Sequence, residues 1–213
     1  MSGTSGHGVG YFVDSSNEGR PGFIMLDLGT GESWRRLSED PSVLRVNQNV
    51  PSYLRRPFYF DQLGMPVGYQ QEGLDGIQIT PDGKTIYYSP LTSTYLYSVP
   101  TVNLRARDSD PLAELAAHSN ISHHGQRGAD ANGFEGDNQG RIYQLMPTEN
   151  GVFYYDPRDL QTHDSLATLE YCGPTAQVLA SMVTSMSTSI SSSSSQTGIL
   201  VSMGDSTLAQ SFV

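Results

Sequence analysis

Cysteine is nearly absent from this chain of 213 residues, where Cys172 stands alone. Because an internal disulfide needs two thiols, no disulfide framework is available, and cysteine usage does not indicate a redox compartment. Basic residues are also scarce, with 12 Lys and Arg against 22 Asp and Glu and a formal net charge of −10. Such a surface repels phosphate backbones and anionic lipid, so we expect no nucleic-acid binding.

Long hydrophobic runs are missing as well. No segment approaches the ~20 apolar residues of a membrane span, so we expect no membrane partner. Residues 1–9 have neither the basic cluster nor the apolar core of a signal peptide. We therefore expect no targeting signal in this sequence. One glycosylation sequon is present, Asn120-Ile121-Ser122, in a polar stretch of the kind that carries glycans in secreted proteins.

Glycine and tyrosine, by contrast, are plentiful, and two stretches repeat. The chain has 22 Gly and 12 Tyr, a composition typical of short strands joined by tight turns. Asp75–Pro100 (DGIQITPDGKTIYYSPLTSTYLYSVP) aligns with Asn132–Pro157 (NGFEGDNQGRIYQLMPTENGVFYYDP), about 57 residues further on. Each copy predicts three strands, with the first turn ending at Gly83 or Gly140. A looser copy covers residues 8–38, so we expect about three antiparallel blades of a β-propeller.

The segments outside these repeats predict less structure. Residues 101–129 are predicted as a surface insertion with one or two helical turns after Asp110. Nine of the fifteen residues from 181 to 195 are serine. Such a tract has too little apolar surface to offset the entropy lost on ordering. We therefore expect a partial propeller over residues 8–163 and a poorly ordered Ser-rich tail over residues 164–213.

The phrasing of the repeats resembles a known family. GIQITPDGKTIYYSPLTSTYLYSVPTVNLR and NGFEGDNQGRIYQLMPTENGVFYYDP are similar to blades of the yellow / major royal jelly proteins, and YFVDSSNEGRPGFIMLDLGTGESWRRLSEDPSV resembles the preceding blade. The resemblance implies an extracellular six-bladed propeller with a central channel. Members include amine binders and pigment-pathway proteins, some of them linked to dopachrome conversion. Because members are commonly longer and begin with a signal peptide, we expect this chain to be a truncated form with an incomplete ring.

Two residues are candidates for a site at the mouth of that channel. Residues just ahead of the innermost strand of each blade face the mouth, and Asp75 and Asn132 hold matched positions there. The arrangement is similar to that of gluconolactonase-type propellers, whose divalent cation is held by oxygen ligands from several blades. Asp and Asn oxygens suit such a cation, for example Ca²⁺. Alternatively, each side chain caps a turn ahead of a glycine through an Asx-type hydrogen bond.

Other motifs favour structural roles. His123 and His124 are adjacent, so their side chains diverge and a solvated loop is expected. Asp130-Ala131-Asn132 lacks the later ligands of a calcium loop, and Gly29-Thr30-Gly31 lacks the helix of a phosphate loop. The tyrosines are expected to pack between blades.

Two functions follow as hypotheses. The first is a propeller that binds a small molecule in its central channel, with isomerase-like activity in full-length relatives. The second is a metal-dependent lactone hydrolase in which a cation polarises the ring carbonyl. An open ring also leaves apolar blade faces uncovered, so we expect self-association through the open blade edges.

Overall fold

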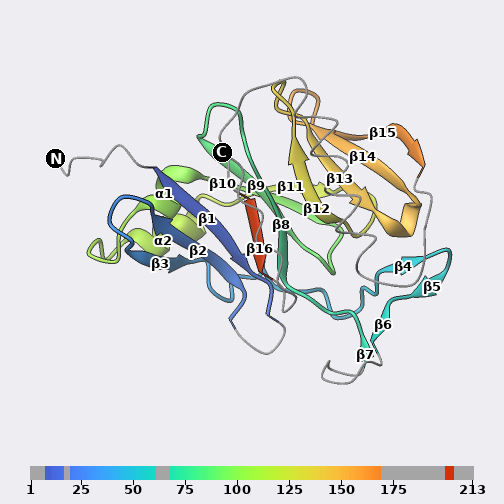
Figure 1. Ribbon diagram of the computed structural model, residues 1–213, viewed down its shortest axis with the longest axis horizontal. Coiled ribbons are helices and arrows are strands. Elements are labelled where there is room, and N and C mark those ends of the chain that lie inside the picture. Colours follow the sequence, from blue (N-terminus) through green and yellow to red (C-terminus); the bar gives the residue numbers. More distant parts are fainter. Residues whose placement is uncertain (1–7, 17–19, 61–67, 169–199, 204–213) are drawn as a thin grey trace.

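The computed structural model describes residues 8–16, 20–60, 68–168 and 200–203. This part of the chain is all-β, as predicted, with two short α-helices and most strands gathered in three four-stranded sheets (Figure 1). The sheets follow one another across the molecule in Figure 1, coloured blue, green and yellow to orange.

The first sheet combines strands from both ends of the chain. Its three N-terminal strands form an antiparallel meander, and a short C-terminal strand pairs in parallel with the first of them. The turn between the second and third strands is closed by the Asp27 carboxylate, which accepts hydrogen bonds from the backbone N–H groups of Gly29 and Thr30 at 2.8 and 3.0 Å. The strands are β16 (Leu200–Met203), β1 (Val9–Asp14), β2 (Gly22–Asp27) and β3 (Ser33–Arg36), in that order across the sheet.

The second sheet includes residues that the sequence predicted as a surface insertion. Residues 101–129 were expected to form an insertion, but they contain two helices and the fourth strand of this sheet. The helical turns after Asp110 are confirmed. The fourth strand is polar because it lies at the outer edge and is mostly exposed, so it lacks the apolar alternation of a buried strand. The elements are β8 (Leu74–Ile79), β9 (Thr85–Pro90), β10 (Tyr95–Pro100), α1 (Thr101–Arg105), α2 (Ala113–Ser119) and β11 (Ser122–Gln126).

The third sheet is a four-stranded antiparallel meander. The predicted copy supplies its first three strands, and residues that follow the repeat add a polar fourth strand. A short 3₁₀ turn, Pro147–Glu149, connects the two middle strands and ends at Asn150, whose φ of 52° is left-handed. The strands are β12 (Asn132–Gly136), β13 (Ile142–Met146), β14 (Gly151–Asp156) and β15 (Gln161–Thr168).

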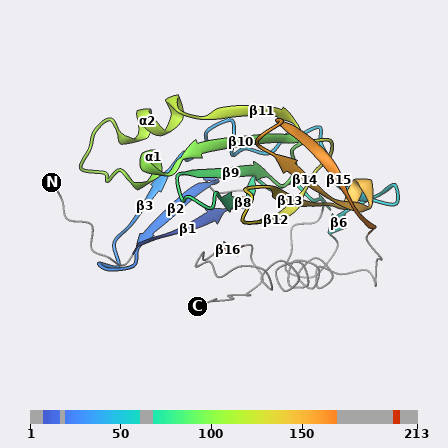
Figure 2. The ribbon, with the colours of Figure 1, turned by 90° about the horizontal axis from the view of Figure 1, so that it is seen from above.

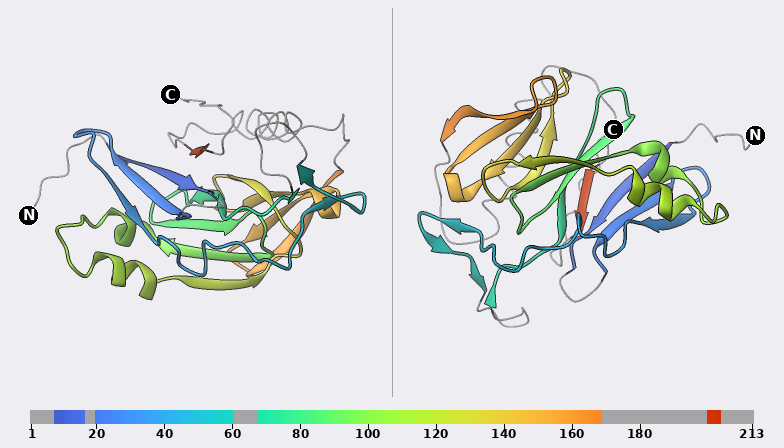
Figure 3. Two further views of the ribbon diagram at one scale, coloured as in Figure 1. Left: turned by 90° about the horizontal axis from the view of Figure 1, so that it is seen from below. Right: turned by 180° about the vertical axis from the view of Figure 1, so that it is seen from behind.

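Two small hairpins connect the first and second sheets along the chain and lie beside the third (Figure 3). Contact with the third sheet is direct, because the backbone N–H of Ser52 donates to Thr148 Oγ1 at 3.1 Å and that hydroxyl donates back to the Ser52 carbonyl at 3.0 Å. The strands are β4 (Ser52–Tyr53), β5 (Arg56–Pro57), β6 (Tyr59–Phe60) and β7 (Gly68–Tyr69).

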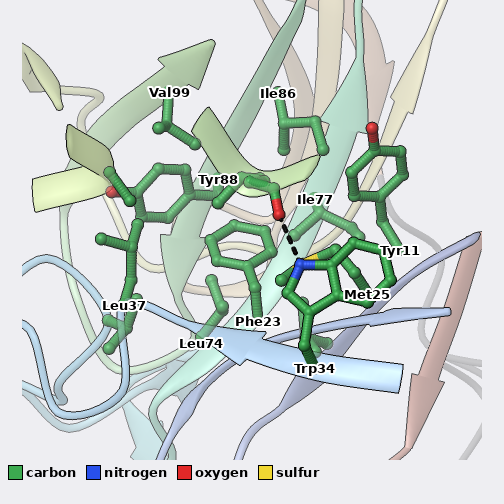
Figure 4. Close-up of a cluster of buried hydrophobic side chains, with 14 residues drawn as sticks. Tyr11, Phe23, Met25, Trp34, Leu37, Leu74, Ile77, Ile86, Tyr88 and Val99 are labelled. Atoms are coloured by element: carbon green, nitrogen blue, oxygen red, sulfur yellow. Dashed lines mark hydrogen bonds between the residues drawn. The ribbon is translucent and has the colours of Figure 1, made fainter. Parts of the chain in front are cut away.

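The second sheet lies between two hydrophobic cores, one shared with each neighbouring sheet. Successive side chains of a strand point to opposite faces. Tyr88 accordingly packs with Phe23 of the first sheet, and Tyr87 packs with Tyr155 of the third. The first core also holds Trp34, whose Nε1 donates to the Leu104 carbonyl at 2.8 Å (Figure 4). Burial on both faces explains why the middle of β9, Ile86-Tyr87-Tyr88, lacks polar alternation. The expected packing of tyrosines between sheets is confirmed for these buried ones.

The tail is described only in part. Residues 164–168 continue β15, and Leu200–Met203 form β16, which lies on the opposite side of the molecule from the helices and β11 (Figure 2). The Ser-rich stretch from 181 to 195 lies outside the described residues, so its expected disorder stays a prediction.

Candidate functional site

The two candidate residues stand at the start of neighbouring strands, β8 and β12. These strands lie very close together, since a Cβ added to Gly76 would come within 2.7 Å of the Phe134 ring. A Cβ added to Gly136 would come within 2.4 Å of the Gln78 amide nitrogen. The contacts advance together along both strands, so the strands run in the same direction and begin at the same end. The structure therefore brings the two candidates to the same end of these two adjacent strands.

Both candidates are half-buried and adjoin a break in strand register. Asp75 is the second residue of β8, where the pairing with β9 shifts between Leu74 and Gly76. Asn132 opens β12, where the pairing with β13 shifts before Phe134, and Gly133 between them has a left-handed φ of 64°. Such bulges re-aim side chains and are frequent beside functional sites.

Negative charge accumulates next to Asp75. Burial raises the pKa of the Glu72 carboxyl, and the neighbouring charge of Asp75 raises it further. The Gln70 amide offsets this only weakly, because its Nε2 donates to Glu72 Oε2 at 3.4 Å. A positive group placed beside Glu72 would lower the pKa of its carboxyl and so offset both the burial and the repulsion from Asp75.

A buried cation, Arg127, also interacts electrostatically with Asp75. Arg127 is only 2% exposed, and its guanidinium donates to the Ser93 carbonyl at 2.7 Å and to the Ala129 carbonyl at 3.1 Å. Burial lowers its pKa to about 9, and the charges of Asp130 and Asp75 act in the opposite direction. Arg127 therefore stays protonated at neutral pH, held in place by backbone carbonyls.

Asp130 completes this group of charges. Burial raises the pKa of its carboxyl to about 6, while Arg127 lowers it, and the Asn49 side-chain amide donates a hydrogen bond to it. From the sequence, Asp130 was a candidate only as a calcium-loop ligand, and Glu72 and Arg127 were not candidates. Their polar side chains follow no strand period, and Arg127 fell in the segment interpreted as an insertion. The signal that was available is position, since Arg127 and Asp130 directly precede an inner strand.

A divalent cation was expected to use Asp75 and Asn132. Among the residues that the structure describes, no three His, Cys, Asp or Glu side chains come close enough to hold a metal ion. A cation at this edge would therefore need further oxygen ligands beyond the Asp75 carboxylate and the Asn132 amide.

The two adjacent histidines lie in a strand, so the loop interpretation is wrong. His123 and His124 belong to β11. The side chains diverge as expected, but His124 is half-buried against Tyr87, with ring centroids 5.1 Å apart. Its Nε2 is 2.8 Å from Ser98 Oγ, and its Nδ1 is 3.1 Å from the Tyr155 hydroxyl. The sequence signal for this contact is weak, because pairing of β11 with β10 depends on the whole sheet.

The sequence of this chain matches the model of one protein family. The model of the major royal jelly protein family matches residues 2–205. This chain belongs to the major royal jelly protein family. No curated protein sequence matches it.

Two solved structures are similar to this major royal jelly protein family member. One is the gluconolactonase XC5397 from Xanthomonas campestris, with 15% identity and a TM-score of 0.45, covering 79% of this chain and 48% of that one. The other is a calcium-binding protein, regucalcin, from Agrobacterium tumefaciens strain C58, with 14% identity and a TM-score of 0.32, covering 72% of this chain and 58% of that one. This chain thus spans about half the length of both.

The asparagine of the glycosylation sequon is accessible to solvent in this family member. Asn120 is exposed at the end of α2, and its side-chain amide donates to the Ala116 carbonyl at 2.8 Å. No helix in the described ranges combines the length and the apolar character that crossing a membrane requires.

Proposed function

We propose that this chain contributes three blades to an extracellular six-bladed propeller and binds a small organic amine at the mouth of the channel, where β8 and β12 begin. The observation that carries the proposal is the partly buried carboxyl group of Glu72 beside the charge of Asp75. Family membership supports it, because the resemblance includes amine binders.

The electrostatics favour a cation over a neutral ligand. An ammonium group beside Glu72 would offset the desolvation and the repulsion that raise its pKa. A hydrogen bond to a charged group contributes about 1.5–3 kcal/mol. The Arg127 guanidinium does not supply this charge to Glu72, since it donates its hydrogen bonds to backbone carbonyls and to the side-chain amide oxygen of Gln144. The amine would therefore approach from the Glu72 side.

Isomerisation by full-length relatives needs a placed acid or base. Glu72 is the carboxyl group suited to that part, because a raised pKa brings proton exchange closer to neutral pH. We propose this activity for the complete propeller.

The alternative is metal-dependent lactone hydrolysis, in which Asp75 and Asn132 would supply two of the cation's oxygen ligands. The specific observation that favours it is that these two oxygen-bearing residues lie at the same end of the adjacent strands β8 and β12.

Thermal unfolding with added ligand separates the two. Phenethylamine should raise the melting temperature of the chain by mass action, while the uncharged 2-phenylethanol should not. The Glu72→Gln variant should lose the amine effect. Glu39→Gln is the matched control, since Glu39 forms an exposed pair with Arg20 in the loops beside the first sheet. Stabilisation by Ca²⁺ and not by the amine would favour lactone hydrolysis, and no response to either would contradict both.

A further inference from the structure

A pocket lies between the second and third sheets. It is open to solvent and has a volume of about 600 Å³. Apolar side chains from both sheets line it, among them Leu96, Met146 and Phe153. Its lining comes from β10, β11, β13, β14 and β15 and the loops beside them, whereas Asp75 and Asn132 lie on β8 and β12. The pocket shares Arg127 with the group of charges around Asp75, but Glu72, Asp75 and Asn132 do not line it.

Both walls of this pocket are four-stranded sheets that the described residues supply in full. The second sheet contributes Leu96 and His124, and the third contributes Phe153 and Tyr155. No further blade is needed to form it. A ligand here therefore does not depend on closure of the ring.

A chain of hydrogen bonds reaches the pocket from the second sheet. Ser98 Oγ is 2.8 Å from His124 Nε2, and His124 Nδ1 is 3.1 Å from the hydroxyl of Tyr155. His124 and Tyr155 both line the pocket, whereas Ser98 does not, and both Ser98 and Tyr155 are buried. Burial lowers the pKa of His124 and raises that of Tyr155 to about 12, so at neutral pH the imidazole is uncharged and the phenol keeps its proton.

A neutral imidazole has one donor and one acceptor, so the hydrogen bonds that link Ser98, His124 and Tyr155 can be arranged in two ways. If Nε2 donates to Ser98, Nδ1 accepts from Tyr155, and the Tyr155 oxygen is left to accept from a ligand. If Ser98 donates to Nε2, Nδ1 donates to Tyr155, and the Tyr155 hydroxyl is left to donate. A ligand hydroxyl satisfies both arrangements, because it both donates and accepts.

Charge plays little part in this pocket. Arg127 lines it, but its guanidinium donates to the carbonyls of Pro90, Ser93 and Ala129 and to Gln144. Glu149 is exposed and disfavours an anionic ligand. The remaining polar lining residues, including Gln126, are uncharged.

We infer that this pocket binds a neutral ring compound that carries a hydroxyl group, with the ring against Leu96, Met146 and Phe153 and the hydroxyl on Tyr155. The apolar walls contribute affinity, and the Ser98–His124–Tyr155 chain selects an alcohol or phenol over the bare hydrocarbon.

Titration calorimetry with 1-naphthol on the full chain tests this inference. We expect saturable binding of 1-naphthol and weaker binding of 1-naphthoate, which is anionic at neutral pH. In Tyr155→Phe, the loss of one hydrogen bond should weaken naphthol binding about three- to tenfold. Tyr154→Phe is the matched control. Tyr154 is the preceding residue of β14, and its ring stacks on His163 and contacts Tyr143 instead.

A second variant fills the pocket and leaves Ser98, His124 and Tyr155 themselves unchanged. Thr162 lines the pocket and pairs with Tyr155 across the sheet, so Thr162→Trp should abolish binding while circular dichroism shows a folded protein. The inference is overturned if naphthol does not saturate. It is equally overturned if Tyr155→Phe and Tyr154→Phe bind alike, or if Thr162→Trp binds as the wild type does. Phenethylamine binding at Glu72 should be unchanged in all three variants, which keeps the two sites distinguishable.

Discussion

The close approach of β8 and β12 makes Gly76→Ala a sharp test of the architecture. The new methyl carbon would lie 2.7, 2.8 and 3.1 Å from three carbons of the Phe134 ring. That ring is 3% exposed and packed in the second core, so it has little room to move. Overpacking of this kind costs about 1–3 kcal/mol. A glycine to alanine change within an unobstructed strand would instead stabilise by about 0.5–1 kcal/mol, so the two expectations differ in sign.

Urea unfolding followed by far-UV circular dichroism measures this difference. The Phe134→Leu variant serves as partner in a double-mutant cycle. It removes the ring that clashes, so Gly76→Ala should cost less in its presence than in the wild type, with a coupling of about 1 kcal/mol or more. If Gly76→Ala is neutral or stabilising in the wild type, then β8 and β12 do not approach as described. The juxtaposition of Asp75 and Asn132 would then fail as well.

Three further outcomes are expected. Because the Asp130 pKa is raised to about 6, the folded state binds more protons than the unfolded state, whose aspartate pKa is about 3.9. The free energy of unfolding should therefore fall as pH rises from 4 to above 6, and urea titrations of Asp130→Asn should show a flatter profile; an unchanged profile would contradict this sign. Expression in a secretory host should add a glycan at Asn120, seen as a mass decrease after glycosidase treatment that Asn120→Gln lacks. Size-exclusion chromatography should show self-association through uncovered sheet faces, and a monomer unfolding cooperatively at high denaturant would refute it.

The sequence predicted the features that depend on local chemistry. The repeats beginning at Asp75 and Asn132 gave six of the strands, because their apolar alternation and turn glycines are encoded within each strand pair. Gly83 and Gly140 do have left-handed φ values, of 70° and 83°. The turn at Gly29 likewise follows from its neighbour Asp27.

The features that were missed depend on tertiary context. β11, with the sequence SHHGQ, has no strand period, since it is an exposed edge that forms only because β10 offers it a partner. Arg127 looks like a surface residue until carbonyls of other segments surround it. The contact of His124 with Ser98 and Tyr155 joins strands of two sheets, which no local pattern predicts.

The parallel pairing of β16 with β1 bears on how the protein is made. Tyr11 pairs with Leu200, so these partners leave the ribosome far apart in time. At about 5–20 residues per second, the interval is on the order of ten to forty seconds. The second and third sheets, which lie within residues 74–168, are synthesised completely during that interval. The nascent first sheet meanwhile exposes the free edge of β1, where a chaperone or a neighbouring nascent chain on the same polysome could pair before β16 arrives.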